Sequence, residues 1–599
     1  MVPRVIRPKR EDGCFFTIPV LYGLINEKRV SSLKLCGAAI LIECLIEQGT
    51  ETIFGFPGGA VLPIYDELYK RSDRIGHVLT AHEQHAGHAA DGYARVTGKT
   101  GVCLATSGPG ATNLVTAIAT AYMDSTPTVF ITGNVPQTLM GTDSFQEADI
   151  SGITMPITKH NYMVTDVTKL ADTIREAFFI ARTGRPGPVL VDIPKDVQIA
   201  ETEYVPVTGD ALIPPLSASH PTMQLRPVGA ALERYKLKIE PFAARAVELI
   251  QQSERPLIYY GGGVILSGAE RQLLELANLV DAPVVSSLMG LGAISEADPR
   301  VLGMLGMHGT HAANIAMQRC DLLIAVGVRF SDRALGNAAT FAPNAKVLHI
   351  DIDRAEINKN VTTTLHLTGD ARTVLDLLLP RLEQKTHATW MRQAQSMAEE
   401  YLNNDLFEPR KILKTMSEIA PEITVATDVG QHQMWTAQHF PFIRPRQLVT
   451  SGGLGTMGFG LGAAMGAAKA LGEPVVLATG DGSFRMNLTE LSTIAYYQFP
   501  VIIVLFNNGT LGMVRQWQTL FFGKRYSQTT LDRGPDFMKL ADAYGIGHAR
   551  VNTVEGFRAA FSEALSLRAP YLIECMLDID EMVAPMVAPG SPIDSFCLN

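Results

Sequence analysis

Two polar residues in the C-terminal third of the chain each follow an apolar run, and together they suit a divalent cation. Asp481 follows the run 475–478, and Asn508 follows the run 501–506. Both runs are predicted strands of a parallel sheet, and ligands bind at the carboxyl ends of such strands. A carboxylate and an amide oxygen form the oxygen-only site that Mg²⁺ prefers, and a bound phosphate completes its ligands. The turn around the aspartate has glycines that let its backbone approach this phosphate: Gly480, Asp481, Gly482 and Ser483.

Each of these turns is ordinary by itself, but at this separation the pair matches the signature of thiamine diphosphate binding. That cofactor must lose a proton from a weakly acidic ring carbon, and its own aminopyrimidine is the base. A carboxyl group hydrogen-bonded to the pyrimidine ring favours the basic imino form. Glu83 is the candidate, because it follows the predicted strand 77–79 and opens a helix of small residues. His82, His85 and His88 are not predicted to bind a metal, because no acidic or cysteine ligand completes the set.

The rest of the chain repeats one pattern of apolar strand, glycine-rich turn and alanine-rich helix, which indicates βαβ units on parallel sheets. Strands are predicted at 52–55, 101–105, 128–132 and 256–260, among others. The fold class is therefore α/β, with three doubly wound parallel-sheet domains. The predicted order is an N-terminal extension at 1–32, a first domain at 33–200, a linker at 201–236, a middle domain at 237–378, a second linker at 379–405, a third domain at 406–582 and a tail at 583–599.

Composition excludes several classes of protein. The chain is 46% hydrophobic, carries a net charge of −9 and has no basic block, so a nucleic acid is not an expected partner. No apolar run is long enough to span a membrane. Seven scattered cysteines without a CxxC spacing indicate a reducing compartment. The basic and then apolar N-terminus resembles a signal peptide but has no cleavage site, and it does not support plastid import, so we expect a cytoplasmic protein.

From about residue 33 to 592, the chain resembles the large, catalytic subunit of acetolactate synthase, a thiamine-diphosphate-dependent enzyme. Three motifs are shared with thiamine-dependent decarboxylases and carboligases, at 53–60, 106–113 and 184–189. Three more are specific to the narrower family, at 141–149, 428–435 and 512–518. The resemblance implies a pyrimidine-binding first domain, an FAD-binding middle domain and a diphosphate-binding third domain.

The resemblance also implies an activity and partners. Pyruvate would be decarboxylated on the cofactor, and its two-carbon fragment would pass to a second pyruvate or to 2-oxobutyrate. The products, 2-acetolactate and 2-aceto-2-hydroxybutyrate, lead to branched-chain amino acids. In this family the residues that correspond to Glu83 and Asp481 lie in different domains and the site forms between two chains, so the resemblance implies a homodimer or homotetramer. A separate small regulatory subunit would be a further partner.

Residue roles follow from the same resemblance. Glu83 would activate the cofactor, and the carbonyl group of Thr510 would join Asp481 and Asn508 around Mg²⁺. Gly455 and Met457 would hold thiamine diphosphate in its bent conformation, with Gln431 near the diphosphate. The residues expected to contact substrates are Phe145, Gln146 and Lys195 in the channel, Met513 beside the reacting carbon and Trp517 in the acceptor pocket.

The middle domain resembles the type that binds FAD without net redox chemistry. Arg185 would reach the flavin from the first domain, and Arg329 and Arg333 suit its phosphates. Asp351 or Asp370 would lie near its ribose or adenine. The remaining expected flavin contacts are His308, Gly309 and Asp332, the last of which follows a serine where the family usually has a second aspartate.

Three alternatives remain. Another thiamine-dependent decarboxylase, carboligase or pyruvate oxidase would share the cofactor motif. Glu83 argues against a glyoxylate-carboligating enzyme, and the Phe145–Gln146 and Trp517 motifs argue against a pyruvate oxidase. An NAD dehydrogenase would explain the turn 261–263 after the strand 256–260, but the glycine spacing and the downstream acid are missing. A non-catalytic binding protein would be expected to have lost Glu83, Asp481 or Asn508.

Overall fold

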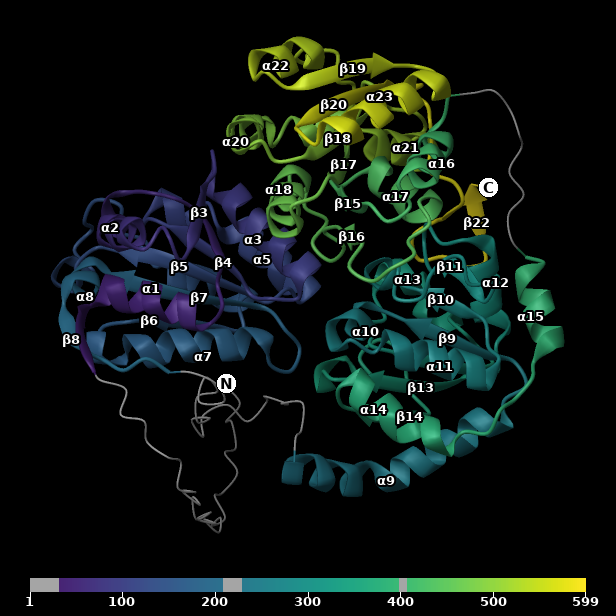
Figure 1. Cartoon of the computed structure of the whole chain (residues 1–599). Helices are drawn as coiled ribbons and strands as arrows, with labels where there is room; N and C mark the ends of the chain where they lie inside the picture. The colour runs from purple at the N-terminus through teal and green to yellow at the C-terminus, as the bar shows by residue number, and fades with distance from the viewer. Residues whose placement is uncertain (1–31, 208–228, 398–406, 599) are drawn as a thin grey trace, which may run out of the picture.

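The computed structural model describes residues 32–207, 229–397 and 407–598, so nearly all of the predicted N-terminal extension lies outside the described residues. Figure 1 shows three α/β bodies, with the N-terminal one at the left, the middle one at the lower right and the C-terminal one at the top. Each contains a six-stranded parallel sheet with helices on both faces. In the described part of the chain, no helix combines the length and the apolar character needed to cross a membrane.

The sheet of the N-terminal body has the order β3-β2-β4-β5-β7-β6. Every residue of β5 is buried, as expected for a central strand that is covered on both faces. Its strands are β2 (Thr52–Phe56), β3 (Gly76–Leu79), β4 (Gly101–Ala105), β5 (Thr128–Asn134), β6 (His160–Met163) and β7 (Pro188–Pro194). Its helices are α1 (Gly37–Glu47), α2 (Leu62–Lys70), α3 (Glu83–Thr97), α4 (Pro109–Thr112), α5 (Val115–Asp124), α6 (Ile150–Thr154), α7 (Leu170–Arg182) and α8 (Lys195–Ile199).

The C-terminal sheet repeats this topology. Its order is β16-β15-β17-β18-β20-β19, and when strands are counted within their own body both sheets read 2-1-3-4-6-5. Its strands are β15 (Thr424–Thr427), β16 (Leu448–Val449), β17 (Val475–Gly480), β18 (Val501–Asn507), β19 (Gly547–Val551) and β20 (Tyr571–Met576). Its helices are α16 (Pro409–Ile419), α17 (Gln431–His439), α18 (Gly460–Leu471), α19 (Asp481–Phe484), α20 (Leu491–Tyr497), α21 (Gly512–Phe521), α22 (Phe537–Ala543) and α23 (Val554–Leu567).

The middle sheet has a different order, β11-β10-β9-β12-β13-β14, which reads 3-2-1-4-5-6 within its body. This is the arrangement of dinucleotide-binding folds, in which ligands bind where the strand order reverses. Its strands are β9 (Pro256–Tyr260), β10 (Val284–Ser286), β11 (Val301–Met304), β12 (Leu322–Val326), β13 (Lys346–Asp351) and β14 (Leu365–Thr368). Its helices are α9 (Gly229–Gln252), α10 (Gly262–Ser267), α11 (Glu270–Val280), α12 (His311–Arg319), α13 (Asp332–Leu335), α14 (Ala371–Leu378) and α15 (Ala388–Gln395).

Segments that the sequence suggested to be connections contain regular structure. In the segment 201–236, β8 (Glu201–Tyr204) pairs with β1 (Leu33–Cys36), and α9 begins at Gly229. In the tail, β21 (Met586–Val587) pairs with β22 (Phe596–Leu598). Ile593 of the tail is fully buried in a core cluster of the middle body. The tail therefore lies against the middle body, as Figure 1 also shows.

Helices α3 and α18 join the N-terminal and C-terminal bodies through small residues. A Cβ atom on Gly92 would lie 2.2 Å from the carbonyl oxygen of Ala463, and one on Gly466 would lie 1.9 Å from that of Ala89. These distances are far below van der Waals contact, so only glycine fits at either position. The close approach fixes α3, which begins at Glu83, against the body that carries Asp481.

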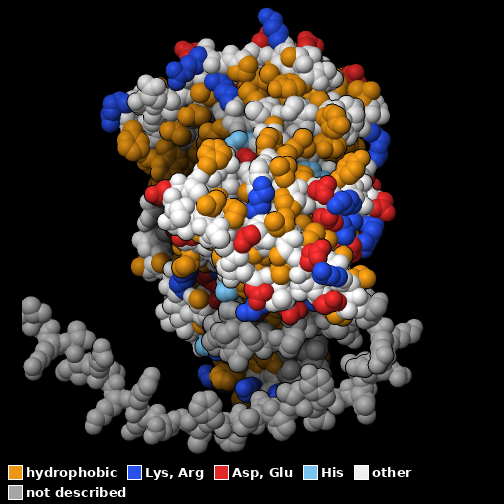
Figure 2. All heavy atoms as spheres, turned by 90° about the vertical axis from the view of Figure 1, so that its left-hand side faces the viewer, with side chains coloured by type: hydrophobic (Ala, Val, Ile, Leu, Met, Phe, Trp, Pro, Cys, Tyr) orange, Lys and Arg blue, Asp and Glu red, His pale blue; other side chains and the backbone are white. Residues whose placement is uncertain are grey.

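Apolar side chains also lie exposed on the surface. Figure 2 shows many of them over the upper part of the face on the side of the N-terminal body. Among the described residues, Phe145 is 86% exposed and Tyr496 is 81% exposed, and Met155, Met486 and Leu79 are also exposed. Large exposed apolar surface is typical of a protein interface.

Candidate active site

Asp481 and Asn508 lie at the ends of neighbouring strands. Strands β17 and β18 are paired in parallel up to Gly480 and Phe506, so the residues that follow them leave the sheet at the same edge. Asn508 donates a hydrogen bond from its side-chain nitrogen to the side-chain oxygen of Gln431, at 3.0 Å. Its own amide oxygen, the atom that a cation would bind, therefore points away from Gln431.

Asp481 is buried, and its environment suits a positive charge. Its Oδ2 atom has no hydrogen-bond partner among the described residues. Burial raises the pKa of Asp481 to about 6, because the ionised form is poorly solvated there. A bound cation would remove this cost. The donor set of carboxylate and amide oxygens thus fits Mg²⁺, the metal expected from the sequence.

The backbone around these residues is closely packed against neighbouring side chains. A Cβ atom on Gly512 would lie 1.8 Å from the side-chain oxygen of Gln431, and one on Gly482 would lie 2.6 Å from Leu511. Gln431 is held in turn, because its side-chain nitrogen donates to Gln516 at 3.1 Å and to the carbonyl group of Glu581 at 2.7 Å. The hydroxyl group of Thr510 donates to the carbonyl group of Thr529. Gln431, Asn508 and Gly512 therefore form one ordered wall.

Glu83 is the first residue of α3 and is only 9% exposed. Its Oε2 atom accepts a hydrogen bond from the side-chain nitrogen of Asn113, at 3.0 Å. A Cβ atom on Gly110 would lie 3.3 Å from Oε1, and one on Gly108 would lie 2.8 Å from the side chain of Gln146. The structure thus brings Glu83 and Gln146 to the same glycine-rich turn.

The start of α3 is anchored by the C-terminal body. Glu490 is fully buried and accepts hydrogen bonds from the backbone nitrogens of Ala81 and His82, at 3.1 and 3.0 Å. It also bonds to Nδ1 of His85 at 3.0 Å. Glu490 lies in η10 (Leu488–Glu490), a few residues after the Asp481 motif. The orientation of Glu83 therefore depends on the neighbouring body.

A glycine-rich loop, residues 450–458, lies beside the Asp481 motif. Gly455 and Gly458 have positive φ angles of 69° and 86°, which favour glycine. The backbone nitrogen of Gly458 donates to Asp428 at 2.8 Å. The methyl group of Met457 lies 3.9 Å from the place of a Cβ atom on Gly482. The loop thus lies against the turn that follows β17.

One large cavity, of about 1240 Å³, runs between the three bodies. Arg185 lines it from the N-terminal body, and Gly455, Met513 and Trp517 line it from the C-terminal body. The middle body contributes the residues predicted to bind the flavin: His308, Arg329, Asp332, Arg333, Asp351 and Asp370. Gly309 does not line the cavity and instead packs in the turn against Gly306.

Two side chains link the bodies across this cavity. Arg185 donates to Asp353 at 3.1 Å and to Glu356 at 3.0 Å, both in the middle body. The guanidinium group of Arg333 lies over the indole ring of Trp517, 5.9 Å from the ring centroid. The acceptor pocket and the flavin pocket that the sequence predicted are therefore parts of one space.

Three polar side chains at the cavity are buried or half-buried. Nδ1 of His308 has no hydrogen-bond partner among the described residues, and burial lowers the pKa of His308 to about 4. Burial raises the pKa of Asp351 to about 7. Burial also lowers the pKa of Arg329 from its usual range. A polar ligand with phosphates and hydroxyl groups, such as FAD, fits these groups.

The remaining predicted residues lie apart from the cavity. Phe145 is largely exposed, and Lys195 opens α8 at the carboxyl end of β7. Glu83 and Asp481 form no hydrogen bond with each other in the described part of a single chain.

Several buried polar residues were not predicted. Asp428 accepts hydrogen bonds from the backbone nitrogen of Gly458 and, at 3.0 Å, from the side-chain nitrogen of Asn487. It therefore joins the glycine-rich loop to the segment after α19. Asn113 and Glu490 contact the start of α3. Asp428 lies in the motif 428–435, which the sequence had already singled out. No residue close to Glu490 in the sequence indicates which groups it bonds to.

Comparison with known proteins agrees with this geometry. Models of the thiamine pyrophosphate enzymes match the chain in three places: the N-terminal TPP binding domain at residues 36–153, the central domain at 243–378 and the C-terminal TPP binding domain at 428–575. Thiamine pyrophosphate is the same molecule as thiamine diphosphate. The matches cover the parts that carry Glu83 and Asp481.

Curated relatives are similar over almost the whole chain. A probable acetolactate synthase large subunit of Methanocaldococcus jannaschii is 47% identical over 577 residues, which cover 92% of this chain and 94% of that one. An acetolactate synthase large subunit of Cyanidium caldarium is 44% identical, with 94% of this chain and 97% of the relative covered. An acetolactate synthase of Arthrospira platensis is 45% identical, with 94% and 98% covered. The chain therefore belongs to the thiamine pyrophosphate enzymes and, among them, to the family of acetolactate synthase large subunits.

Proposed function

We propose that this chain is an acetolactate synthase. It decarboxylates pyruvate and joins the two-carbon fragment to a second pyruvate or to 2-oxobutyrate, in the biosynthesis of branched-chain amino acids. The observation that carries the proposal is the buried carboxylate oxygen of Asp481 near Asn508, which has no hydrogen-bond partner among the described residues, in a chain that is 47% identical to a probable acetolactate synthase large subunit. Other thiamine-dependent decarboxylases would share the metal site but not this similarity.

Asp481, Asn508 and the carbonyl group of Thr510 would hold Mg²⁺ and, through it, the diphosphate. Gln431 lies beside Asn508 and would contact the same group. Thiamine diphosphate, when bound, supplies the electron sink that decarboxylation of a 2-oxo acid requires. Gly455 and Met457 would set the bent shape of the cofactor, and Glu83 would hold a proton at its pyrimidine nitrogen.

The substrate-contacting residues would act by positioning and by excluding water. Met513 and Trp517 line the cavity on the side of the C-terminal body, where the apolar surface favours the methyl or ethyl group of the acceptor. Phe145, Gln146 and Lys195 would complete the channel from the N-terminal body. Lysine and glutamine suit the carboxylate of a 2-oxo acid.

FAD would occupy the middle part of the cavity. Arg185, Arg329 and Arg333 would contact its phosphates, and Asp351 or Asp370 its ribose or adenine. His308 and Asp332 would lie beside the remainder, and Gly309 would shape the turn next to it. The overall reaction has no net redox change, so the flavin is a structural requirement in this proposal.

The working unit would be a homodimer or homotetramer. As the family resemblance implies, Glu83 of one chain and Asp481 of its partner would act on the same cofactor. The exposed Phe145, Met155 and Tyr496 are apolar surface that such a partner would cover. A separate small subunit would regulate the enzyme.

The experiment is an assay of acetolactate formation by the purified chain. Pyruvate, thiamine diphosphate, Mg²⁺ and FAD are supplied, each cofactor is omitted in turn, and acetolactate is measured as acetoin after acid treatment. The proposal expects activity that disappears without any one of the three. Activity in flavin-free protein would overturn the flavin assignment alone. Loss of pyruvate to acetaldehyde or acetate, even with a regulatory subunit supplied, would identify a decarboxylase or an oxidase instead.

A further inference from the structure

A buried ion cluster lies where the N-terminal body meets the glycine-rich loop. Arg95 in the last turn of α3 contacts Asp91 of the same helix and Asp124 at the end of α5, with Nη2 of Arg95 3.0 Å from Oδ2 of Asp124. The two aspartate side chains are fully buried, and that of Arg95 is 9% exposed. Buried charges of this kind are expensive to desolvate, so their remaining hydrogen-bonding positions need partners.

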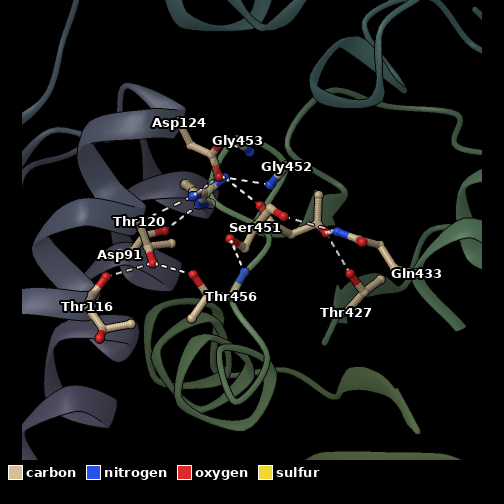
Figure 3. A network of polar contacts seen from close by, with 12 residues as sticks. Asp91, Thr116, Thr120, Asp124, Thr427, Gln433, Ser451, Gly452, Gly453 and Thr456 are labelled. Carbon is tan, nitrogen blue, oxygen red and sulfur yellow. Dashed lines mark hydrogen bonds and ion pairs between the residues drawn. The ribbon is translucent and has the colours of Figure 1, made fainter. Parts of the chain in front are cut away.

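The glycine-rich loop supplies those partners. Asp124 accepts hydrogen bonds from the backbone nitrogens of Gly452 and Gly453, at 3.0 and 2.6 Å. Arg95 donates from Nη1 to the carbonyl group of Thr450, at 2.8 Å. Figure 3 shows Asp124 pointing from its helix to the two glycines. The loop is thus held by charge-assisted hydrogen bonds, which are the stronger kind.

A second contact holds the loop on the other side. The hydroxyl groups of Thr120 in α5 and Thr456 in the loop are 2.7 Å apart, and the backbone nitrogen of Thr456 donates to Ser451 at 3.0 Å. The fit is tight, because a Cβ atom on Gly453 would lie 2.9 Å from both Asp124 and the carbonyl group of Met123. The loop therefore cannot shift without losing these bonds.

In the sequence, these contacts lie before and after Gly455. Gly455 itself has few neighbouring atoms. Gly455 is exposed to the large cavity, and the nearest atom to a Cβ placed on it is 4.0 Å away, on Val429. Its conformation, with a φ angle of 69°, is therefore set by the residues before and after it. Thr450, Gly452 and Gly453 precede it, and Thr456 follows it.

We propose that Asp124, Arg95 and Thr120 are positioning residues for thiamine diphosphate. They act through the glycine-rich loop and hold Gly455 and Met457 in the conformation that binds the cofactor. The inference rests on the proposed role of Gly455 and Met457 in shaping the cofactor. It adds that the N-terminal body of the same chain, and not only the body that binds the metal, determines the affinity for the cofactor.

The physical consequence is a change in affinity more than in rate. When the loop is loosened, only a fraction of the protein is competent to bind, and the apparent dissociation constant rises by the inverse of that fraction. Once the cofactor is bound at saturation, its own contacts order the loop again. The proposal thus separates the effect on cofactor binding from the effect on kcat.

The experiment measures binding of thiamine diphosphate, in the presence of Mg²⁺, to the full chain by titration calorimetry. D124A removes an acceptor of two loop hydrogen bonds and is expected to raise Kd by about tenfold to a hundredfold. D124N keeps an acceptor oxygen without the charge, so its Kd is expected to lie between those of D124A and the wild type. At saturating cofactor, kcat for acetolactate is expected to stay within about threefold of the wild type.

T120V provides a test that does not depend on the fate of the D124A protein. Valine has the shape of threonine without the hydroxyl group, and the loss of one hydrogen bond to Thr456 is expected to raise Kd by about threefold. The matched control is E47Q, because Glu47 forms a buried ion pair with Arg175 in the same body, at 3.1 Å, away from the loop. E47Q is expected to lower the thermal midpoint without changing Kd.

The results distinguish this inference from the proposed function. A Kd for T120V and D124N equal to that of the wild type would overturn the inference, and so would an equal rise in E47Q. Wild-type protein that binds thiamine diphosphate but forms no acetolactate would overturn the proposed function, while the binding measurements would still decide the role of Asp124.

Discussion

Replacement of Glu83 by glutamine tests the activation of the cofactor. Glutamine has the size of glutamate, and its amide oxygen can accept the hydrogen bond that Asn113 donates at 3.0 Å. The structural cost is the difference between a charge-assisted and a neutral hydrogen bond, about 1 kcal/mol. Fold and cofactor binding are therefore expected to survive in E83Q.

The chemical cost is larger, because glutamine has no carboxyl proton to share with the pyrimidine nitrogen. Loss of a positioned acid–base group lowers kcat by about 10²- to 10⁴-fold, which corresponds to about 3–5 kcal/mol of activation free energy. The expected rise in activation free energy is thus several times larger than the expected loss of hydrogen-bond energy. The two can be separated by measuring kcat at saturating cofactor and the thermal midpoint of the same sample.

The assay follows acetolactate formation at saturating pyruvate, thiamine diphosphate, Mg²⁺ and FAD. E51Q is the matched control, because Glu51 pairs with Lys99 on the surface and its loss is expected to change stability by less than about 1 kcal/mol. An E83Q protein with kcat within threefold of the wild type would refute the role of Glu83. An E83Q protein that fails to fold would instead contradict the expectation that the fold survives this replacement.

Three further predictions address the metal, the acceptor and acid stability. D481N is expected to raise the half-saturating Mg²⁺ concentration by more than about tenfold, because losing a residue that only supports a metal ligand already lowers metal affinity by about that factor. An unchanged Mg²⁺ dependence would contradict the assignment of Asp481 as a metal ligand. W517L is expected to lower the preference for 2-oxobutyrate over pyruvate by about tenfold, because discrimination by one buried methylene group is of that size. A competition assay measures the ratio of the two products, and an unchanged ratio would exclude Trp517 from the acceptor pocket. Burial lowers the folded-state pKa of His308 to about 4, so the unfolded state takes up a proton first as pH falls below about 6.5. The wild type is therefore expected to lose about 2 kcal/mol of unfolding free energy relative to H308Q between pH 7 and pH 5, as measured by urea denaturation, and parallel losses in both proteins would contradict this.

Much of the fold could be predicted because its central strands are long, apolar and bounded by glycine turns. The strands β4 (Gly101–Ala105) and β9 (Pro256–Tyr260) have the predicted limits. Short edge strands gave no such signal, since β16 has two residues and β14 alternates exposed and buried positions. Tertiary pairing, not local sequence, forms these elements.

The candidate site could be predicted only in part, for a related reason. Asp481 and Asn508 follow recognisable strands, and their side chains are of the kind that binds a metal. Their proximity could therefore be predicted from the order of the strands in the sheet. Glu490 and Asp124 have no such signal, because their partners are backbone nitrogens 409 and 329 positions away in the sequence. A buried acid that bonds to distant backbone is indistinguishable in the sequence from a solvated one.

Complementation between two inactive variants tests whether the site of this acetolactate synthase is shared between two chains. E83Q and D481N chains are co-expressed with different tags, and mixed dimers are purified through both tags. One site of a mixed dimer then has Glu83 and Asp481 intact, so acetolactate formation is expected to return to about half of the wild-type rate per dimer. Mixed dimers as inactive as either parent would contradict the account, since they would place both residues of each site in one chain.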